Sequence, residues 1–416
     1  MREVGRLLGA SVVRTGIAWQ DVEPLPGIYN ETYLSQVSAT IDAARAEGMS
    51  VVVTVWAVPR WASDSSFWNR PPGGYPAGEY RHFYPIRTDC LDDYRLFAEN
   101  LSRRLAGRVM AYECWNEPNL WTFLYPQRTA SDSAFAAHRY VDMVRAFSAG
   151  IRSGDPTAKV VAGSTAPSGS NNAYSTSPQR FARIVQKASV GDSFDVYSHH
   201  PYMTGGVKNV APEQPPRDPS TAVALGNIST LLEIFPDKPF YLTEYGYNTS
   251  YNYAFGFSVT HAHQADYLRR AYVFARRYPQ IKLLVWYTLH DWSPTDRADD
   301  PRGMYLGLRN VRGARKPAWY AFAGGNALTL SAPFNLEPGS PLLLRGRLTC
   351  AAVGGLEGKV LVVQRYRRDT GWRTVAKVTT GDDGYCRLRL WPQRSASYRL
   401  SWPGVVRSPL RTVLVR

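Results

Sequence analysis

The chain has 416 residues, of which 44% are hydrophobic and 20% charged; this is enough apolar sequence for two packed domains and excludes a disordered protein. No run approaches the roughly 18 apolar residues of a membrane span, and residues 1–10 lack the apolar core of a signal peptide. The net charge is +15, and residues 325–416 hold 15 Lys+Arg against 5 Asp+Glu, so the basic character belongs mainly to the end of the chain.

Up to about Asn326, short β-rich runs alternate with longer amphipathic stretches. Residues 3–8 have the composition of the end of a helix. Seven predicted strands follow: Val12–Trp19, Ser50–Val58, Val109–Asn116, Lys159–Ser164, Phe194–His200, Pro239–Gly246 and Lys282–Leu289. Several of these runs are apolar throughout, as in strands buried on both faces. The stretches between them include the helical patterns Leu91–Ala106 and Gln264–Arg277, and the last is Gly303–Phe322.

This alternation predicts an α/β fold, and at this length a (β/α)8 TIM barrel. Because only seven strand-like runs are found, we expect the first strand of the barrel to be missing upstream of Gly9-Ala10.

Beyond the barrel pattern, the sequence changes to short strands separated by turn signals. The predicted strands are Leu342–Leu348, Lys359–Tyr366, Trp372–Thr379, Tyr385–Leu390, Ser397–Trp402 and Leu410–Val415. Arginines alternate with apolar residues in several of them, which predicts a small all-β, Ig-like sandwich with one wet face per sheet. We therefore predict a barrel domain at residues 1–325 and a β-sandwich domain at residues 326–416.

Two features of the predicted sandwich leave alternatives open. Cys350 and Cys386 lie in the same small domain and could pair, although the redox compartment cannot be read from four cysteines. The basic charge fits either an anionic partner, such as an acidic glycan or cell-wall polymer, or a solvated Arg-rich face without a partner.

Two glutamates end predicted barrel strands, at the carboxyl edge where a parallel barrel carries its active site. An apolar run ends at Asn116-Glu117, where Pro118 stops the strand, and a second ends at Thr243-Glu244. Cleavage of a glycosidic bond needs this pair of groups, because one carboxyl must protonate the leaving oxygen while the other, ionised, attacks the anomeric carbon. A single Glu at a strand end would be weak support, since such residues often have structural roles.

Aromatic residues are abundant, with 12 Trp and 26 Tyr. Several Trp, including Trp56, stand at predicted strand ends, where their rings could stack on the apolar faces of sugars. Each of them could equally be a core residue.

The segment Trp115-Asn116-Glu117-Pro118-Asn119, with Thr243-Glu244 downstream, resembles clan A of the glycoside hydrolases over roughly residues 10–322. The resemblance implies that Glu117 is the acid/base after the fourth barrel strand and Glu244 the nucleophile after the seventh. In this chain the two glutamates lie at the ends of the third and sixth predicted strands. If the first strand of the barrel is missing, these strands correspond to the fourth and seventh of the clan. The resemblance also implies substrate-site roles for Arg14 beside the nucleophile, Asn116 on the sugar 2-hydroxyl, His200, Tyr202 on the nucleophile, and Trp286 as a sugar-subsite floor.

Within the clan, the chain is most similar to family 39 and next to family 5. The third strand of the expected barrel ends at Trp56 without the His usual in family 5, and Pro59-Arg60-Trp61 is closer to family 39. Thr243-Glu244-Tyr245-Gly246, in contrast, is closer to family 5.

Other polar residues fit this site less well. Glu113 alternates with Trp115 and is interpreted as a structural or supporting residue. Of the clustered histidines, we expect His200 in the active site and His199, His261 and His263 on loop or helix surfaces. No carboxylate or Cys lies at metal-ligand spacing, so we predict no metal, and we predict no cofactor.

The sequence thus predicts an O-glycosyl hydrolase that acts on an oligo- or polysaccharide with net retention. Two alternatives remain: a transglycosidase on the same scaffold, and a catalytically impaired glycan-binding protein. The expected partner is carbohydrate rather than nucleic acid or membrane, and the expected location is extracellular or at the cell surface, although this chain shows no signal peptide.

Overall fold

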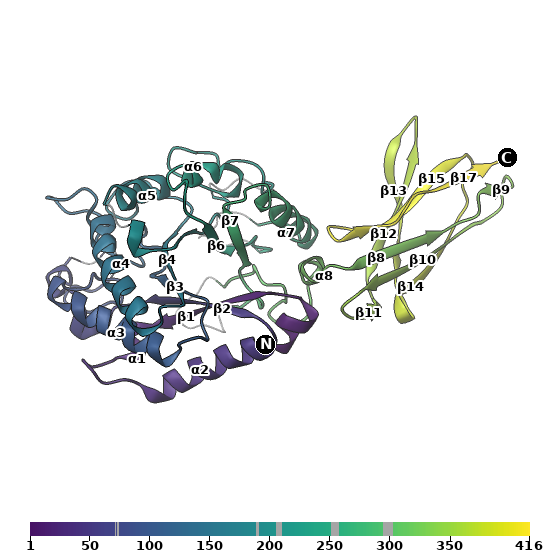
Figure 1. Cartoon of the computed structure of the whole chain (residues 1–416). Coiled ribbons are helices and arrows are strands. Elements are labelled where there is room, and N and C mark those ends of the chain that lie inside the picture. Colours follow the sequence, from purple (N-terminus) through teal and green to yellow (C-terminus); the bar gives the residue numbers. More distant parts are fainter. Residues whose placement is uncertain (71, 73–74, 189–190, 205–209, 251–257, 294–302) are drawn as a thin grey trace.

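The computed structural model describes residues 1–416 except 71, 73–74, 189–190, 205–209, 251–257 and 294–302. Its first part is a curled parallel sheet surrounded by helices, and its second part is built from antiparallel strands (Figure 1). The parallel strands are β1 (Val12–Ala18), β2 (Ser50–Trp56), β3 (Ala111–Cys114), β4 (Lys159–Thr165), β5 (Val196–His199), β6 (Phe240–Tyr245) and β7 (Ile281–Trp286). Their spatial order follows the chain, as expected for the predicted α/β barrel.

Helices connect these strands and cover the outside of the sheet (Figure 1). They are α1 (Trp19–Val22), α2 (Glu31–Ala46), α3 (Leu91–Arg104), α4 (Phe135–Gly154), α5 (Pro178–Lys187), α6 (Ser229–Leu232), α7 (His261–Ala275) and α8 (Pro317–Ala323). The predicted helical face of α3 is buried at Tyr94, Phe97 and Leu101. Gly150 lets α4 pack closely on α3, because a Cβ there would lie 2.8 Å from the Ala98 Cβ.

The parallel sheet is open in the described part of the chain. β1 and β7 are its two ends, and each is hydrogen-bonded to one neighbouring strand. Seven strands were predicted, and these seven are found. A cavity of about 1380 Å³ is lined by residues of both end strands, among them Val12 and Leu284, and it extends from Glu244 to Phe322 of α8. A short π-helical turn at Glu3–Leu7 precedes β1, as predicted from the composition of residues 3–8.

The antiparallel part contains two sheets, one of four strands and one of six. The first sheet consists of β8 (Asn326–Ser331), β10 (Leu342–Cys350), β11 (Gly354–Gly355) and β14 (Tyr385–Leu390). The second consists of β9 (Asn335–Leu336), β12 (Val360–Arg367), β13 (Gly371–Thr379), β15 (Ala396–Trp402), β16 (Val406–Arg407) and β17 (Arg411–Val415). The buried residues Leu344, Leu348, Leu361, Val363 and Leu400 form the core of this predicted sandwich.

The cysteines do not form the disulfide that the sequence left open. Cys350 and Cys386 are buried and free, as are Cys90 and Cys114. Within the described residues, no helix combines the length and the hydropathy that a bilayer crossing requires.

Candidate active site

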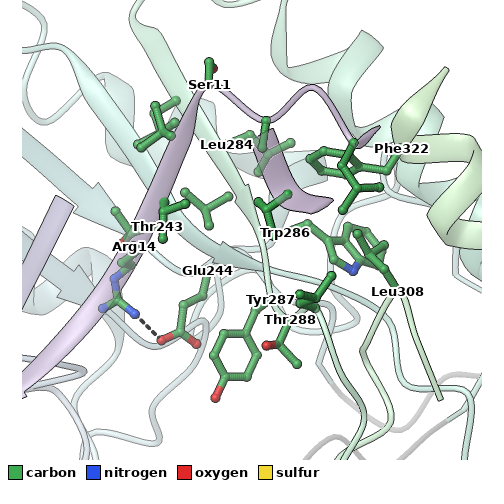
Figure 2. Close-up of a pocket in the computed structure, with 18 of the residues that line it drawn as sticks. Ser11, Arg14, Thr243, Glu244, Leu284, Trp286, Tyr287, Thr288, Leu308 and Phe322 are labelled. Atoms are coloured by element: carbon green, nitrogen blue, oxygen red, sulfur yellow. Dashed lines mark hydrogen bonds and ion pairs between the residues drawn. The ribbon is translucent and has the colours of Figure 1, made fainter. Parts of the chain in front are cut away.

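The predicted site residues gather at the carboxyl ends of the parallel strands. Arg14 comes from β1 and Glu244 from β6, and Asn116 and Glu117 lie two and three residues beyond the end of β3. Figure 2 shows Arg14 and Glu244 pointing toward each other from separate strands. Residues up to 230 positions apart in the chain thus meet at one edge of the sheet, where active sites of parallel barrels lie.

Glu244 is held by two donors. Arg14 Nη1 donates to its Oε1 at 2.6 Å, and the Tyr202 hydroxyl donates to its Oε2 at 3.0 Å. Both donors stabilise the ionised carboxylate and fix its orientation. Burial opposes the charge on Arg14, but the carboxylates Glu113 and Glu244 outweigh this effect and raise the pKa of the guanidinium. Arg14 therefore stays cationic beside Glu244.

Glu117 lies on strained backbone just beyond β3. Its φ is +40° and that of Trp115 is +68°, both in the left-handed region that L side chains rarely adopt. The Glu117 N–H donates to Ser164 O at 2.9 Å, and the Glu117 carboxylate lies 2.9 Å from His200 Nδ1. This backbone conformation directs the Glu117 carboxylate toward His200 just beyond the end of β3.

The two predicted catalytic glutamates lie close together. One carboxylate oxygen of each and one ring nitrogen of His200 all lie within 4.8 Å of one another. By spacing alone, these three side chains could also share a metal ion. Arg14 already donates to Glu244 and would repel a cation there, so the surroundings suit a carboxylate pair better than a metal centre.

His200 links the two glutamates. Besides Glu117, its Nδ1 has Glu244 Oε2 at 3.8 Å, and its Nε2 lies 3.2 Å from Ser164 Oγ and from Thr243 Oγ1. Burial disfavours the imidazolium, but the charges of Glu244 and Glu117 outweigh it and raise the pKa of His200 above its usual value. Both carboxylates therefore favour the protonated form of this ring.

Glu113 makes more contacts with the site residues than the sequence suggested. It is fully buried on β3, where Arg14 Nε donates to it at 2.8 Å, Thr54 Oγ1 at 2.6 Å and Thr243 Oγ1 at 2.8 Å. Burial tends to raise the pKa of Glu113, but the nearby Arg14 and His200 and the hydrogen bond from Thr54 lower it below its ordinary value. Glu113 is thus an anionic anchor for Arg14, in keeping with the supporting role considered for it.

Asn116 and Trp56 both line the cavity that contains Glu244. Asn116 Oδ1 accepts from Arg14 Nη2 at 2.9 Å. Trp56, half-buried at the end of β2, packs edge-on against Phe123 and His82, with ring centroids 5.7 and 5.3 Å away. Phe123 and His82 were not singled out in the sequence, although His82 lies in the loop that follows this strand.

Trp286, the expected floor of a sugar subsite, lines the cavity that contains Glu244. It is 8% exposed, its Nε1 donates to Leu306 O at 3.0 Å, and its ring points toward Leu308 and Phe322 in Figure 2. The phenol ring of the next residue, Tyr287, lies beside Glu244 in the same view. Tyr287 lines the same cavity as Trp286 and Glu244.

His199 was expected on the surface, and this expectation is wrong. Its side chain is fully buried at the end of β5, with Nδ1 2.8 Å from Thr165 Oγ1 and Nε2 2.8 Å from Val223 O. Burial lowers the pKa of His199 to about 3, so the ring is neutral. It is a core histidine that fixes the loop after β5.

The fold and this site define a glycoside hydrolase of clan A. The family model of cellulases, glycosyl hydrolase family 5, matches residues 6–296, and the chain belongs to this family. No curated protein matches the chain significantly. Family 5 is the second of the two families that the sequence resembles.

Solved structures of low sequence identity share the fold. A family 39 glycoside hydrolase from the gut symbiont Bacteroides cellulosilyticus has 19% identity and a TM-score of 0.52, over 92% of this chain and 74% of the other. A family 5 subfamily 18 protein from Streptomyces cattleya, solved with GlcNAc, has 17% identity and a TM-score of 0.53, over 76% and 70%. The β-glycosidase BGL167 has 16% identity and a TM-score of 0.53, over 77% and 83%.

Proposed function

We propose that the chain is a retaining glycoside hydrolase that cleaves an oligo- or polysaccharide by double displacement, with Glu244 as nucleophile and Glu117 as acid/base. The observation that carries this proposal is the approach of their carboxylate oxygens to within 4.8 Å. Retaining enzymes hold the two carboxyl groups about 5–5.5 Å apart, whereas inverting enzymes need roughly 6.5–9.5 Å to admit a water molecule between them and the sugar. The short separation favours retention.

In the first step, Glu244 attacks the anomeric carbon while Glu117 gives its proton to the leaving oxygen. The glycosidic C–O bond breaks and a glycosyl ester forms on Glu244. Arg14 and Tyr202, which donate to the two oxygens of Glu244, hold the carboxylate in one orientation for this attack.

In the second step, Glu117 takes a proton from water, whose oxygen attacks the anomeric carbon and releases Glu244. His200 contacts Glu117 at 2.9 Å and faces Glu244 at 3.8 Å, so it holds the acid/base in place beside the nucleophile. These steps require no cofactor or metal.

Two other activities fit the same residues. A transglycosidase would transfer the sugar from Glu244 to a carbohydrate acceptor, and added acceptor would then give a longer product instead of hydrolysis. A catalytically impaired glycan-binding protein would bind oligosaccharides without turnover. The Arg14, Tyr202 and His200 contacts on the two glutamates favour an active enzyme over that alternative.

We also propose that the two parts of the chain have different functions. Residues 1–325 would be the catalytic barrel and residues 326–416 a basic accessory sandwich that binds an anionic glycan or cell-wall polymer. Such substrates are found outside cells, so we propose an extracellular or cell-surface location. The loop 63–87 would border the substrate, because His82 within it packs against Trp56, which lines the cavity that contains Glu244. The second proposed substrate loop, 247–258, lies largely outside the described residues.

The experiment is turnover of a panel of aryl β-glycosides and polysaccharides by the wild type and by Glu244→Ala, with azide added to the variant. We expect loss of activity in Glu244→Ala and recovery with azide, which replaces the missing nucleophile and gives a glycosyl azide of inverted configuration. The glycoside that is turned over identifies the sugar.

Glu233→Ala serves as the matched control, because Glu233 is an exposed glutamate at the end of α6. It should keep wild-type turnover. Full activity in Glu244→Ala would refute the assignment of the nucleophile, and a product of inverted anomeric configuration from the wild type would refute retention.

A further inference from the structure

One face of the four-stranded sheet carries an unusual set of arginines. Arg345 and Arg347 lie on β10 and Arg387 and Arg389 on β14, the strand paired with it. The residues between them, such as Leu344, Leu348 and Cys386, are buried. Because side chains alternate along a strand, all four guanidinium groups project from the outer face. We call these four residues, with Tyr385 and Trp391, the arginine face.

The register brings like charges together. Arg345 lies directly opposite Arg387, and Arg389 opposes Leu343 one pair further along the same two strands. Like charges opposite each other destabilise a strand pair. Arg347 has an ion pair with Asp383, whereas the ion pairs among the described residues include none for Arg345, Arg387 or Arg389. The face therefore carries excess positive charge at a cost to the free energy of folding.

Protection of a sheet edge accounts for only part of this charge. Natural proteins place charged residues on edge strands to prevent sheets from joining. β14 is an edge strand of its sheet, and its arginines fit this explanation. β10 is paired on both sides, with β8 and β14, so Arg345 and Arg347 have no such purpose.

Two exposed aromatic rings extend the row of arginines. Tyr385 is 56% exposed at the start of β14, and Trp391 is 61% exposed directly after its end. The Arg347 guanidinium lies 5.0 Å from the Tyr385 ring centroid. At about 3.4 Å per residue, the row from 385 to 391 is roughly 20 Å long. It thus presents an aromatic ring, two arginines and a second aromatic ring along one extended line.

Several arginines of the six-stranded sheet are engaged by groups within the sandwich. Arg399 lies 3.7 Å from the Trp372 ring centroid and donates to Gln364 at 2.8 Å. Arg367 pairs with Asp369, and Arg411 and Arg416 donate to Leu330 O and Asn335 Oδ1, so these side chains are less available to a ligand than those of the arginine face.

We propose that the arginine face binds an anionic polysaccharide, with the guanidinium groups on its carboxylate or sulfate groups and Tyr385 and Trp391 against its sugar rings. Arginine forms strong, charge-assisted hydrogen bonds with such anions, and aromatic rings offer apolar contact area to sugars. The choice of a glycan over other polyanions rests on the proposed glycoside hydrolase function. The arginine face would keep the enzyme bound to the anionic polysaccharide while the barrel hydrolyses its own substrate.

The test uses the full chain carrying Glu244→Ala, so that binding is measured without turnover. Binding to polygalacturonate, dextran sulfate, an uncharged mannan and single-stranded DNA is measured at several salt concentrations, in this background and with Arg387→Gln/Arg389→Gln added. We expect binding to at least one anionic polysaccharide, none to mannan, and a loss of at least tenfold in the double variant. Because binding a polyanion releases its counterions, the dependence on salt should also become shallower. The carboxylated and sulfated polymers distinguish which anion is recognised.

Arg373→Gln/Arg394→Gln is the matched control, since it removes two charges from exposed positions of the same sandwich outside the arginine face. It should bind as the parent does. Equal affinity in the two double variants, tighter binding to DNA than to either anionic polysaccharide, or binding that salt does not weaken would overturn the proposal.

The outcome is independent of catalysis. With Glu244 intact, Arg387→Gln/Arg389→Gln should hydrolyse a small aryl glycoside at the wild-type rate and melt no lower than the wild type, since it relieves repulsion. Failure of the catalytic proposal would leave the binding result unchanged, and failure of the binding proposal would leave turnover unchanged.

Discussion

Arg14 is the residue on which the candidate site depends most. It contacts Glu244, Asn116 and Glu113, and so joins β1 to β6 and to the carboxyl end of β3. A buried guanidinium with one carboxylate would be poorly compensated, and Glu113 supplies a second anion that is itself fully buried. The position of the proposed nucleophile is therefore set by a glutamate that does not face the substrate.

We expect Glu113→Gln to lower both stability and activity. Removing one partner of a buried ion pair costs about 3–5 kcal/mol of the free energy of unfolding, and a misplaced Arg14 should lower kcat about tenfold, roughly 1.4 kcal/mol of transition-state stabilisation. The pKa of Glu113 is lowered from 4.5, so its contribution to stability is present above that pH and is lost as pH falls through the lower value. Melting temperatures of the two proteins should thus differ most at neutral pH and converge in acid.

Glu99→Gln is the comparison for this variant, because it removes the same charge from ion pairs with Arg95 and Arg103 on the surface of α3. Its kcat should equal that of the wild type. A Glu113→Gln protein with unchanged kcat, or with a stability loss that is the same from pH 7 to pH 3, would contradict the role given to Glu113.

Sequence reasoning succeeded for residues at strand ends and failed for neighbours within a strand. Glu117, Glu244, Arg14, His200 and Tyr202 were expected together and do meet. A parallel strand buried on both faces is apolar on both, so its pattern does not say which residues point into the site. The same ambiguity hid the buried position of His199 beside His200.

At the scale of the element, the end of β4 shapes the acid/base. Gly163 has φ +104°, and the pairing of β4 with β5 shifts register between Ala162 and Thr165. The next residue, Ser164, accepts the Glu117 N–H with its carbonyl oxygen and contacts His200 with its hydroxyl. The irregular end of one strand thus supports a residue that follows another strand.

Gly163→Ala should therefore damage both the fold and the site. A Cβ there would lie 2.5 Å from Ser198 O and 2.8 Å from Tyr197 Cζ, on backbone that disfavours L side chains. We expect a loss of at least about 2 kcal/mol in the free energy of unfolding, together with a lower kcat because Ser164 is displaced. Denaturant titration and turnover of an aryl glycoside measure the two effects.

Gly48→Ala separates strain from steric overlap. Gly48 also has a left-handed φ, +77°, but nothing lies within 4 Å of its added Cβ. It should cost only about 1 kcal/mol and leave kcat unchanged. Equal behaviour of the two variants would mean that the crowding behind Ser164 has no consequence for the site.

Elements with strong periodicity were predicted well. All seven parallel strands and the six predicted strands of the sandwich are found within a few residues of their expected bounds. The strands that were missed include β9, β11 and β16, which have two residues each and are too short to show alternation. β8 was also missed, because it follows directly on the segment attributed to the last barrel helix.

At the scale of the whole molecule, the sandwich is attached through α7 and α8. The Tyr320 ring of α8 packs on Trp402 of β15 with centroids 4.9 Å apart, and Lys359 lies 5.2 Å from the same Tyr320 ring. Gly404, in the turn after β15, lies against the backbone of Ala262 at the start of α7. Side chains and a close backbone contact therefore both join the antiparallel part to the barrel.

Gly404→Ala should loosen this attachment. A Cβ at Gly404 would collide with the Ala262 carbonyl oxygen and lie 2.8 Å from its carbonyl carbon, and backbone on both sides leaves nothing flexible to yield. We expect the sandwich to separate from α7, so that thermal unfolding followed by calorimetry broadens or splits into two transitions. Gly339→Ala is the control, since Gly339 has a similar φ of +81° with no atom within 4 Å of an added Cβ. A single, equally sharp transition in both variants would mean that the contact at Ala262 does not couple the unfolding of the two parts. A split confined to Gly404→Ala would mean that each part has its own core and that the turn at Gly404 couples their unfolding.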